Sequence, residues 1–188
     1  MNENEITKQL VDFTVKNSNF EPSRNYVSLS HCSLPANELI EQWNNGFVAD
    51  EKGRLKCYKG YQMQHDFIER MEKVFGNRIK TDIEVTAFNG MVKGHPDFTF
   101  DELPGDFKSV LQDDWIPVDK LPYKVYCQMQ GYMLYGNYGK SLVIYESRES
   151  GLIKSWWILS NSRVQQLIDD KLKLVVQELS RLNDKKIT

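Results

Sequence analysis

The chain has 188 residues, of which 40% are hydrophobic and 27% charged, and its formal net charge is −2. This length fits one domain with a buried core, and the composition excludes an intrinsically disordered chain. The small net charge also excludes a surface that is basic all over, so a site for nucleic acid would have to be a local positive patch.

We also expect neither membrane insertion nor secretion. Apolar runs such as Trp156–Leu159 are far too short to span a bilayer, and the start Met1–Gln9 is polar and acidic, unlike a secretory signal. Cys32, Cys57 and Cys127 are scattered and form no Cys-x-x-Cys pair. We therefore expect a cytoplasmic protein with reduced thiols and without a disulfide framework.

The first 57 residues carry few signals, and we expect an extension of helices and loops there. Residues Glu5–Val15 and Pro35–Trp43 have the patterns of short helices. A small basic cluster, Lys52–Lys59, precedes the next helix. Two interpretations of this cluster remain open, a solvated loop and a patch that faces nucleic acid.

A longer helix is predicted over Tyr58–Phe75 and ends at Gly76. Large apolar residues recur within it at the spacing of one helical face, which we expect to pack on the core. The stripe consists of Met63, Phe67, Met71 and Val74.

Three strands then follow as a meander. Arg78–Phe88 alternates polar and apolar residues, and Asn89-Gly90 is a strong hairpin signal before Met91–Phe100. Asp101–Gly105 has turn chemistry, because it contains Pro and Gly, and it leads into a third strand over Asp106–Leu111.

The last two strands bring charged side chains together. Side chains alternate along a strand, so Asp106 and Lys108 point one way while Phe107 points into apolar packing. Asp97, on the preceding strand, can lie beside them. Two carboxylates and the Phe107 carbonyl would form a partial oxygen shell for Mg²⁺, and Lys108 would orient a water molecule and offset charge in phosphodiester hydrolysis.

The Asp-x-Lys pattern is not specific by itself, because a solvated charge pair is the simpler explanation of any single copy. Only one copy lies in a strand pattern and follows a Gly-x-Pro-Asp segment. The four copies are Asp50–Lys52, Asp106–Lys108, Asp169–Lys171 and Asp184–Lys186.

A helix that begins near Pro122 carries a polar stripe of Lys124, Gln128 and Tyr132 at a spacing of four residues. An apolar stripe runs beside it. This arrangement is expected if the helix lies over the sheet that carries the charged site, and a surface stripe is the alternative.

Two strands and a helix complete the chain. The strands are predicted over Ser141–Tyr145 and Ile153–Leu159, with Arg148 in the turn between them, where it can reach a phosphate. The helix is predicted over Arg163–Leu182. Its expected buried face is Val164, Leu167, Ile168, Leu172, Val175, Leu179 and Leu182.

These motifs resemble those of a known nuclease superfamily. Pro96-Asp97 followed by Asp106-Phe107-Lys108 resembles the PD-(D/E)xK signature, and Gln128-x-x-x-Tyr132 resembles the extra helical motif of its RecB-like and lambda-type phage exonuclease branches. The resemblance runs from about Gly60 to the last helix. It implies a restriction-endonuclease-like α/β fold, with an α/β/α core around a central mixed β-sheet, in a single nuclease domain with its core at 58–184.

The resemblance also implies roles for the residues of the metal site. Asp97 and Asp106 would bind the metal and Lys108 would position water. Gly60 to Gln64 resembles the first lambda-type motif, whose last position is usually an acid or a histidine. Gln64 brings no charge, so we expect it to orient a metal-bound water, with His65 and Glu69 as minor alternatives.

The resemblance also implies contacts with nucleic acid. Gln128 and Tyr132 would hold both the active site and the DNA backbone. Lys124 on the same stripe, Arg148 in the strand turn and His95 beside the site are further candidates for contacts with phosphate.

The expected activity is that of a Mg²⁺-dependent deoxyribonuclease, with Mn²⁺ as a substitute and without an iron–sulfur cluster, which three scattered cysteines cannot supply. An exonuclease of phage or mobile-element recombination or repair is the first hypothesis. A structure-selective or restriction-type endonuclease is the second, and a nuclease-like module that binds DNA or protein without cutting is the third. The partners expected are linear duplex or single-stranded DNA, a second copy of the chain or a recombination protein, and no membrane.

Overall fold

The computed structural model describes residues 8–9, 25–45 and 50–187. Four long helices lie within this part of the chain, and short 3₁₀ turns precede or follow several of the strands. The helices are α2 (Ala36–Asn45), α3 (Glu51–Phe75), α4 (Tyr123–Gly136) and α5 (Ser162–Ile187).

The strands form two sheets. The larger has the order β2-β5-β6-β7-β8 and is antiparallel except for the parallel pair β6 and β7, and the smaller has the order β1-β4-β3. The strands are β1 (Val27–Ser28), β2 (Ile79–Lys80), β3 (Val85–Ala87), β4 (Val92–Gly94), β5 (Phe98–Phe100), β6 (Leu103–Val110), β7 (Lys140–Ser147) and β8 (Ile153–Leu159).

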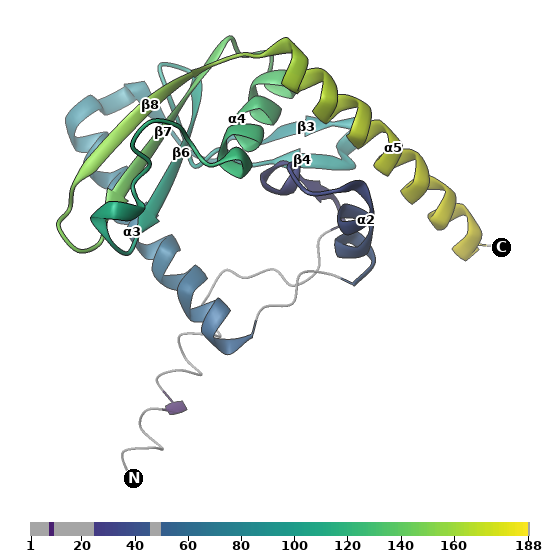
Figure 1. Cartoon of the computed structure of the whole chain (residues 1–188), viewed down its shortest axis with the longest axis horizontal. Coiled ribbons are helices and arrows are strands. Elements are labelled where there is room, and N and C mark those ends of the chain that lie inside the picture. The colour runs from purple at the N-terminus through teal and green to yellow at the C-terminus, as the bar shows by residue number, and fades with distance from the viewer. Residues whose placement is uncertain (1–7, 10–24, 46–49, 188) are drawn as a thin grey trace.

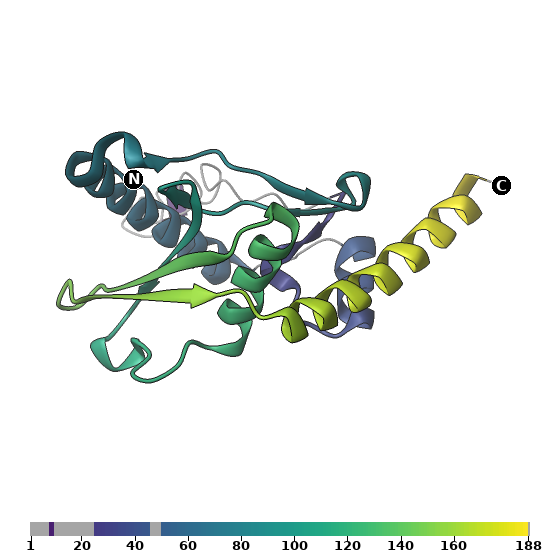
Figure 2. The same ribbon diagram turned by 90° about the horizontal axis from the view of Figure 1, so that it is seen from above.

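The large sheet lies between helices. One face packs against α3 through Phe67 and Met71, and the other packs against α4 and α5 (Figures 1 and 2). Alternation along β7 divides the two cores, since Ile144 faces α3 while Val143 and Tyr145 face α4. The predicted α/β/α core with a central mixed sheet is therefore confirmed.

Helix α3 is longer than the sequence pattern predicted. It begins at Glu51, where the Asp50 carboxylate accepts a hydrogen bond of 2.7 Å from the Gly53 N–H, and it ends at Gly76. The basic cluster Lys52–Lys59 is therefore helical and not a loop, and the boundary at residue 57 falls inside α3. On its core face Phe67 stacks on Phe107 of β6, with ring centroids 4.3 Å apart.

Two of the predicted strands are each divided in the structure. Arg78–Phe88 becomes β2 and β3, which belong to different sheets, and Asp82 between them has a positive φ of 59°. Met91–Phe100 becomes β4 and β5, which flank His95-Pro96-Asp97. Pro96 has no N–H to continue a ladder, so the chain changes sheets there.

The hairpin between β5 and β6 is tighter than predicted. Its turn consists of Asp101 and Glu102, both at positive φ, and not of the whole segment to Gly105. Gly105 lies within β6, where an added Cβ would be 2.2 Å from the Phe98 ring. The glycine is needed for close packing and not for the turn.

The C-terminal elements agree with the predicted order. Strand β8 has the predicted bounds, and β7 and α5 extend beyond theirs. Burial of Leu167 on α5 was wrong, because this residue is 60% exposed, whereas Leu172 and Val175 are fully buried. None of the helices in the described ranges is long and apolar enough to cross a membrane.

We predict that α3 is held on the sheet chiefly by Phe67. Phe67→Ala should lower the free energy of unfolding by about 3–5 kcal/mol, because it leaves a cavity beneath Phe107. Val74→Ala is the control on the same helix. The predicted burial of Val74 was wrong, since it is 72% exposed, and its removal should cost less than about 0.5 kcal/mol. Urea unfolding measures both, and equal effects would contradict this account of the α3 interface.

Candidate active site

The site begins where β6 continues beyond its last residue paired with β5. The last backbone pair between the two strands is Phe98 with Gly105. Beyond it, the Asp97 carboxylate accepts a hydrogen bond of 2.7 Å from the Phe107 N–H. The side chain of Asp97 thus occupies the place of the missing strand. In an extended strand the N–H and C=O of one residue point to the same side, so the Phe107 carbonyl also faces Asp97.

Asp106 is held from the opposite direction by α4. Its Oδ1 accepts a hydrogen bond of 2.9 Å from Gln128 Nε2, and the same amide donates to the Tyr132 hydroxyl at 2.9 Å. Tyr132 donates in turn to the backbone carbonyl of His95 at 3.1 Å. Asp106, Gln128 and Tyr132 are all buried, so the relay fixes the carboxylate in a dry environment.

Lys108 lies on the same face of β6 as Asp106. Its Nζ is 2.6 Å from Asp106 Oδ2, and about a third of its side chain remains exposed. Burial lowers the pKa of Lys108, but the charges of Asp106 and Asp97 outweigh that effect and raise the pKa above its ordinary value. Lys108 is therefore an ammonium ion at neutral pH.

The pKa of Asp97 is also raised, but for a carboxyl group this shift favours the uncharged form. Part of the residue reaches solvent, yet its carboxyl lies among protein atoms, and this desolvation together with the charge of Asp106 raises its pKa to about 7. Lys108, the Phe107 N–H and a hydrogen bond from Gln64 act in the other direction without cancelling the shift. The site thus holds two carboxylates that resist being ionised together.

These residues fit a small, hard divalent cation. Asp106 Oδ2 is a buried oxygen that accepts no hydrogen bond of good geometry, although the Lys108 ammonium lies close to it as an ion pair. Carboxylate and carbonyl oxygens are the ligands that Mg²⁺ prefers. Within the described ranges no cluster of three His, Cys, Asp or Glu side chains is suited to a metal, so water and backbone would complete the shell.

A cleft of about 490 Å³ opens beside Asp97. Gln64 lines it together with His65 and Glu69, which form an exposed ion pair at 3.5 Å. Gln64 is the one of these three residues that forms a hydrogen bond with Asp97, so the structure brings it to the carboxylates. His65 and Glu69 lie further round the helix, on its solvent side.

The remaining candidate residues lie at different depths. His95 is half exposed at the rim of the cleft, 3.5 Å from Glu84. Lys124 is exposed at the start of α4, whereas Gln128 and Tyr132 on the same stripe are buried. Arg148 donates a hydrogen bond of 2.7 Å to Ser109 Oγ. Because side chains alternate along β6, Ser109 lies on the α3 face of the sheet and not on the face of Asp106.

Sequence reasoning missed two neighbours of the site. Tyr145 of β7 is the register partner of Lys108, and burial raises its pKa to about 12 against the opposing effect of that ammonium. Gly94 is the second, since an added Cβ would lie 2.5 Å from the Tyr132 ring. Register between β6 and β7 would have revealed Tyr145, but a single sequence does not give that register.

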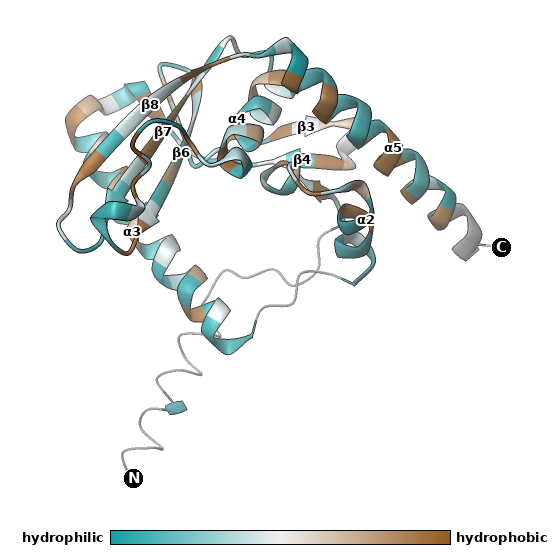
Figure 3. Ribbon diagram, in the orientation of Figure 1, coloured by the Kyte–Doolittle hydropathy of each residue, from teal (hydrophilic) through white to brown (hydrophobic). Residues whose placement is uncertain are grey.

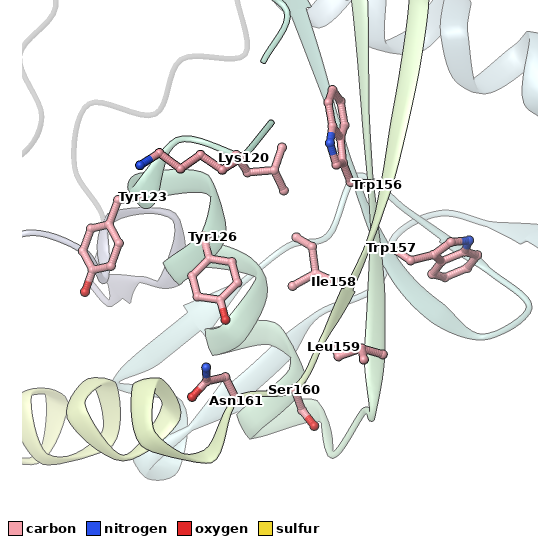
Figure 4. Close-up of a pocket in the computed structure, with 10 residues that line it drawn as sticks. Lys120, Tyr123, Tyr126, Trp156, Trp157, Ile158, Leu159, Ser160 and Asn161 are labelled. Atoms are coloured by element: carbon pink, nitrogen blue, oxygen red, sulfur yellow. The ribbon is translucent and has the colours of Figure 1, made fainter. Parts of the chain in front are cut away.

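A separate cavity of about 610 Å³ lies between β8 and the start of α4 (Figure 4). Trp156 and Ile158 point into it from the strand, Tyr126 faces them from the helix, and Trp157 points to the other side of the sheet. None of the residues predicted for the charged site lines this cavity. It is therefore distinct from the cleft beside Asp97.

The raised pKa of Asp97 gives a pH prediction for the chelated protein. The folded carboxyl holds its proton up to about pH 7, compared with 3.8 ordinarily, so the stability it confers at low pH is lost as the pH rises through this window. Relative to Asp97→Asn, the wild type should lose unfolding free energy between about pH 4 and 7. Calorimetry in chelator measures the difference.

Asp113 supplies a control of opposite sign. Hydrogen bonds from Ser147 and Ser150 lower the pKa of this exposed carboxyl, so the wild type should lose stability relative to Asp113→Asn as the pH falls into the acid range. A difference between wild type and Asp97→Asn that does not vary with pH would contradict the described electrostatics of Asp97.

We compared the chain with protein-family models, curated proteins and solved structures. No protein-family model matches the sequence, and no curated protein matches it. Several solved structures do resemble it. LHK-Exo in complex with dAMP, an alkaline exonuclease from Laribacter hongkongensis, has a TM-score of 0.63 at 14% identity over 87% of this chain and 94% of that one.

A phage-related exonuclease from Haemophilus somnus 129PT has a TM-score of 0.60 at 12% identity, over 86% of this chain and 96% of that one. The protein SSO0001 has a TM-score of 0.59 at 14% identity, over 90% of this chain and 86% of that one. At these identities the likeness concerns the fold. The chain has the restriction-endonuclease-like fold of PD-(D/E)xK phage exonuclease-like structures.

Proposed function

We propose that the chain is a metal-dependent deoxyribonuclease, an exonuclease of the kind used in phage recombination or repair. The observation that carries this proposal is the convergence of Asp97, Asp106 and Lys108 at the free edge of β6. The exonuclease fold of the neighbouring structures supports the choice of reaction.

Asp97, Asp106 and the Phe107 carbonyl would hold the cation, with Mg²⁺ as the first choice and Mn²⁺ as a substitute. A cation there supplies Lewis-acid polarisation of the phosphodiester and a more acidic bound water. The protein contributes by fixing its two carboxylates beforehand, Asp97 through the Phe107 N–H and Asp106 through Gln128. Gln64 keeps Asp97 oriented and adds no charge.

Lys108 acts as a cation and as a hydrogen-bond donor. The charges of Asp106 and Asp97 raise its pKa and keep the proton on Nζ in the metal-free site. The exposed part of the side chain can reach a phosphoryl oxygen or the attacking water, where a positive charge stabilises the transition state more than the ground state.

Gln128 and Tyr132 are positioning residues in this proposal. Both side chains are buried and use their hydrogen bonds within the protein, so we propose that they hold Asp106 and do not contact the DNA backbone. Lys124 and His95 are exposed and remain the better candidates for phosphate contacts. Arg148 would first have to release Ser109.

The proposal predicts which DNA is degraded. The full chain should shorten linear DNA in Mg²⁺ or Mn²⁺, leave covalently closed circles intact, and do neither in chelator, because an exonuclease needs a strand end. Nicking of closed circles would select an endonuclease. Retained binding without any cleavage would select a non-catalytic module.

Lys108→Ala is the matched variant for this assay. It should lower the cleavage rate on the order of 10²–10³-fold, because it removes a contact to charge that develops in the transition state. Lys173→Ala, on α5, removes an equal charge far from β6 and should leave the rate unchanged. Full activity of Lys108→Ala would refute the proposed role of this residue.

A further inference from the structure

Helix α3 continues beyond the sheet that it covers. Its direction is fixed by two aromatic contacts, since Phe75 packs edge-on against Phe100 with centroids 5.2 Å apart and Phe67 stacks on Phe107. Phe100 pairs with Leu103 at the start of β6. Moving toward the N-terminus of α3 therefore means moving along β6 toward its C-terminal end.

The rise per residue of a strand and of a helix gives the position on α3 that is level with the end of β6. Val110, the last residue of β6, is three residues or about 10 Å beyond Phe107. At a rise of about 1.5 Å per residue, that point is level with Gly60 on α3. The segment Glu51–Lys59 thus projects past the strand that carries the active site, as Figure 1 shows.

The projecting segment carries three lysines on one face. Lys52, Lys56 and Lys59 follow the spacing i, i+4 and i+7, and Met63 continues the same line onto the apolar cluster beneath the sheet. We call these three residues the lysine stripe. It therefore starts where the apolar face of α3 ends, and this part of the helix is mostly hydrophilic in Figure 3.

The stripe differs in its pairing from several other surface lysines. Lys73, Lys80 and Lys173 each lie within 4.0 Å of a carboxylate. The three stripe lysines are exposed, and none has a salt bridge within residues 8–9, 25–45 and 50–187. In a chain of net charge −2, this is a local source of free positive charge.

The other half of α3 has the opposite charge. Glu69 and Glu72 line the cleft beside Asp97, together with Asp82. A polyanion bound at the active site would be repelled by these three carboxylates and attracted along the N-terminal half of the helix. The charge distribution of α3 therefore favours DNA that leaves the site along the N-terminal half of this helix.

We propose that the lysine stripe binds the phosphodiester backbone of the DNA that extends away from the scissile bond. This inference rests on the proposed nuclease function and specifies how its substrate is held. Gln64, which acts on Asp97, is level with the active site, and Lys52 lies about 18 Å from it along the helix axis. This distance corresponds to about five phosphates of one strand of a duplex.

The test compares two triple variants of equal charge in the full chain. K52Q/K56Q/K59Q removes the stripe, and K73Q/K80Q/K173Q removes three paired lysines elsewhere. Glutamine has nearly the helix propensity of lysine, so both variants should fold, which the urea midpoint checks. Anisotropy of a labelled 30-base-pair duplex in chelator reports binding without cleavage.

The stripe variant should bind roughly tenfold more weakly at low salt, and its slope of log K against log salt should be shallower by about 2–3, because each lost phosphate contact removes about 0.9. The control variant should keep the slope of the wild type. Equal changes in both triples, no change in the stripe triple, or no binding by the wild type would overturn the inference.

A short substrate separates this inference from the proposed function. A dinucleotide has no phosphate beyond the scissile one and so cannot contact the stripe, and wild type and stripe variant should cleave it at the same rate in Mg²⁺. A slower rate for the stripe variant on the dinucleotide would overturn the inference. If the wild type cleaves nothing but the duplex-binding difference holds, the proposed nuclease fails while the stripe remains a DNA-binding surface.

Discussion

The hydrogen bond from the Phe107 N–H to the Asp97 carboxylate, at 2.7 Å, is the contact on which the rest of the structure depends. The pairing of β5 with β6 ends at Phe98, the first residue of β5, because the chain before it, at Pro96, comes from the smaller sheet. The edge of β6 beyond that point would have a backbone donor without a strand partner. Asp97 satisfies it, and the same contact brings a carboxylate beside Asp106.

Helix α4 fixes the other half of the site and joins it to the smaller sheet. The Gln128 amide bridges Asp106 and Tyr132, and Tyr132 reaches the His95 carbonyl. Close packing of Gly94 against the Tyr132 ring leaves no room for a side chain. The loop that carries Asp97 is therefore held by Phe107 of β6 at Asp97 and by Tyr132 of α4 at His95, which limits how far the two carboxylates can move apart.

The sequence predicted where the candidate site residues lie better than it predicted the bounds of the strands. Alternation along Asp106–Lys108 and the four-residue spacing of Gln128 and Tyr132 are local patterns, and local geometry determines where those side chains point. The division of Met91–Phe100 between two sheets depends on tertiary pairing, which periodicity does not report. The turn over Asp101–Gly105 was predicted too long for a related reason, since two non-glycine residues, Asp101 and Glu102, adopt positive φ there.

Exposure on the helices was equally hard to predict. Val74 and Leu167 continue apolar stripes, but they are 72% and 60% exposed, so tertiary placement and not spacing decides their burial. The lysines at 52–59 are the converse case. They were interpreted as a loop or a patch because no apolar stripe marks that part of α3, and only the cap at Asp50 shows that the helix starts there.

The central claim is that Asp97 and Asp106 form a cation site held ready by the protein. Its most direct test is the melting temperature of the full chain at neutral pH, titrated with Mg²⁺ and with Mn²⁺. A ligand that binds only the folded state raises Tm, so Tm of the wild type should rise with metal concentration, and Tm of Asp97→Asn and Asp106→Asn should rise much less. An equal response of all three proteins, or no response of the wild type, would contradict the claim.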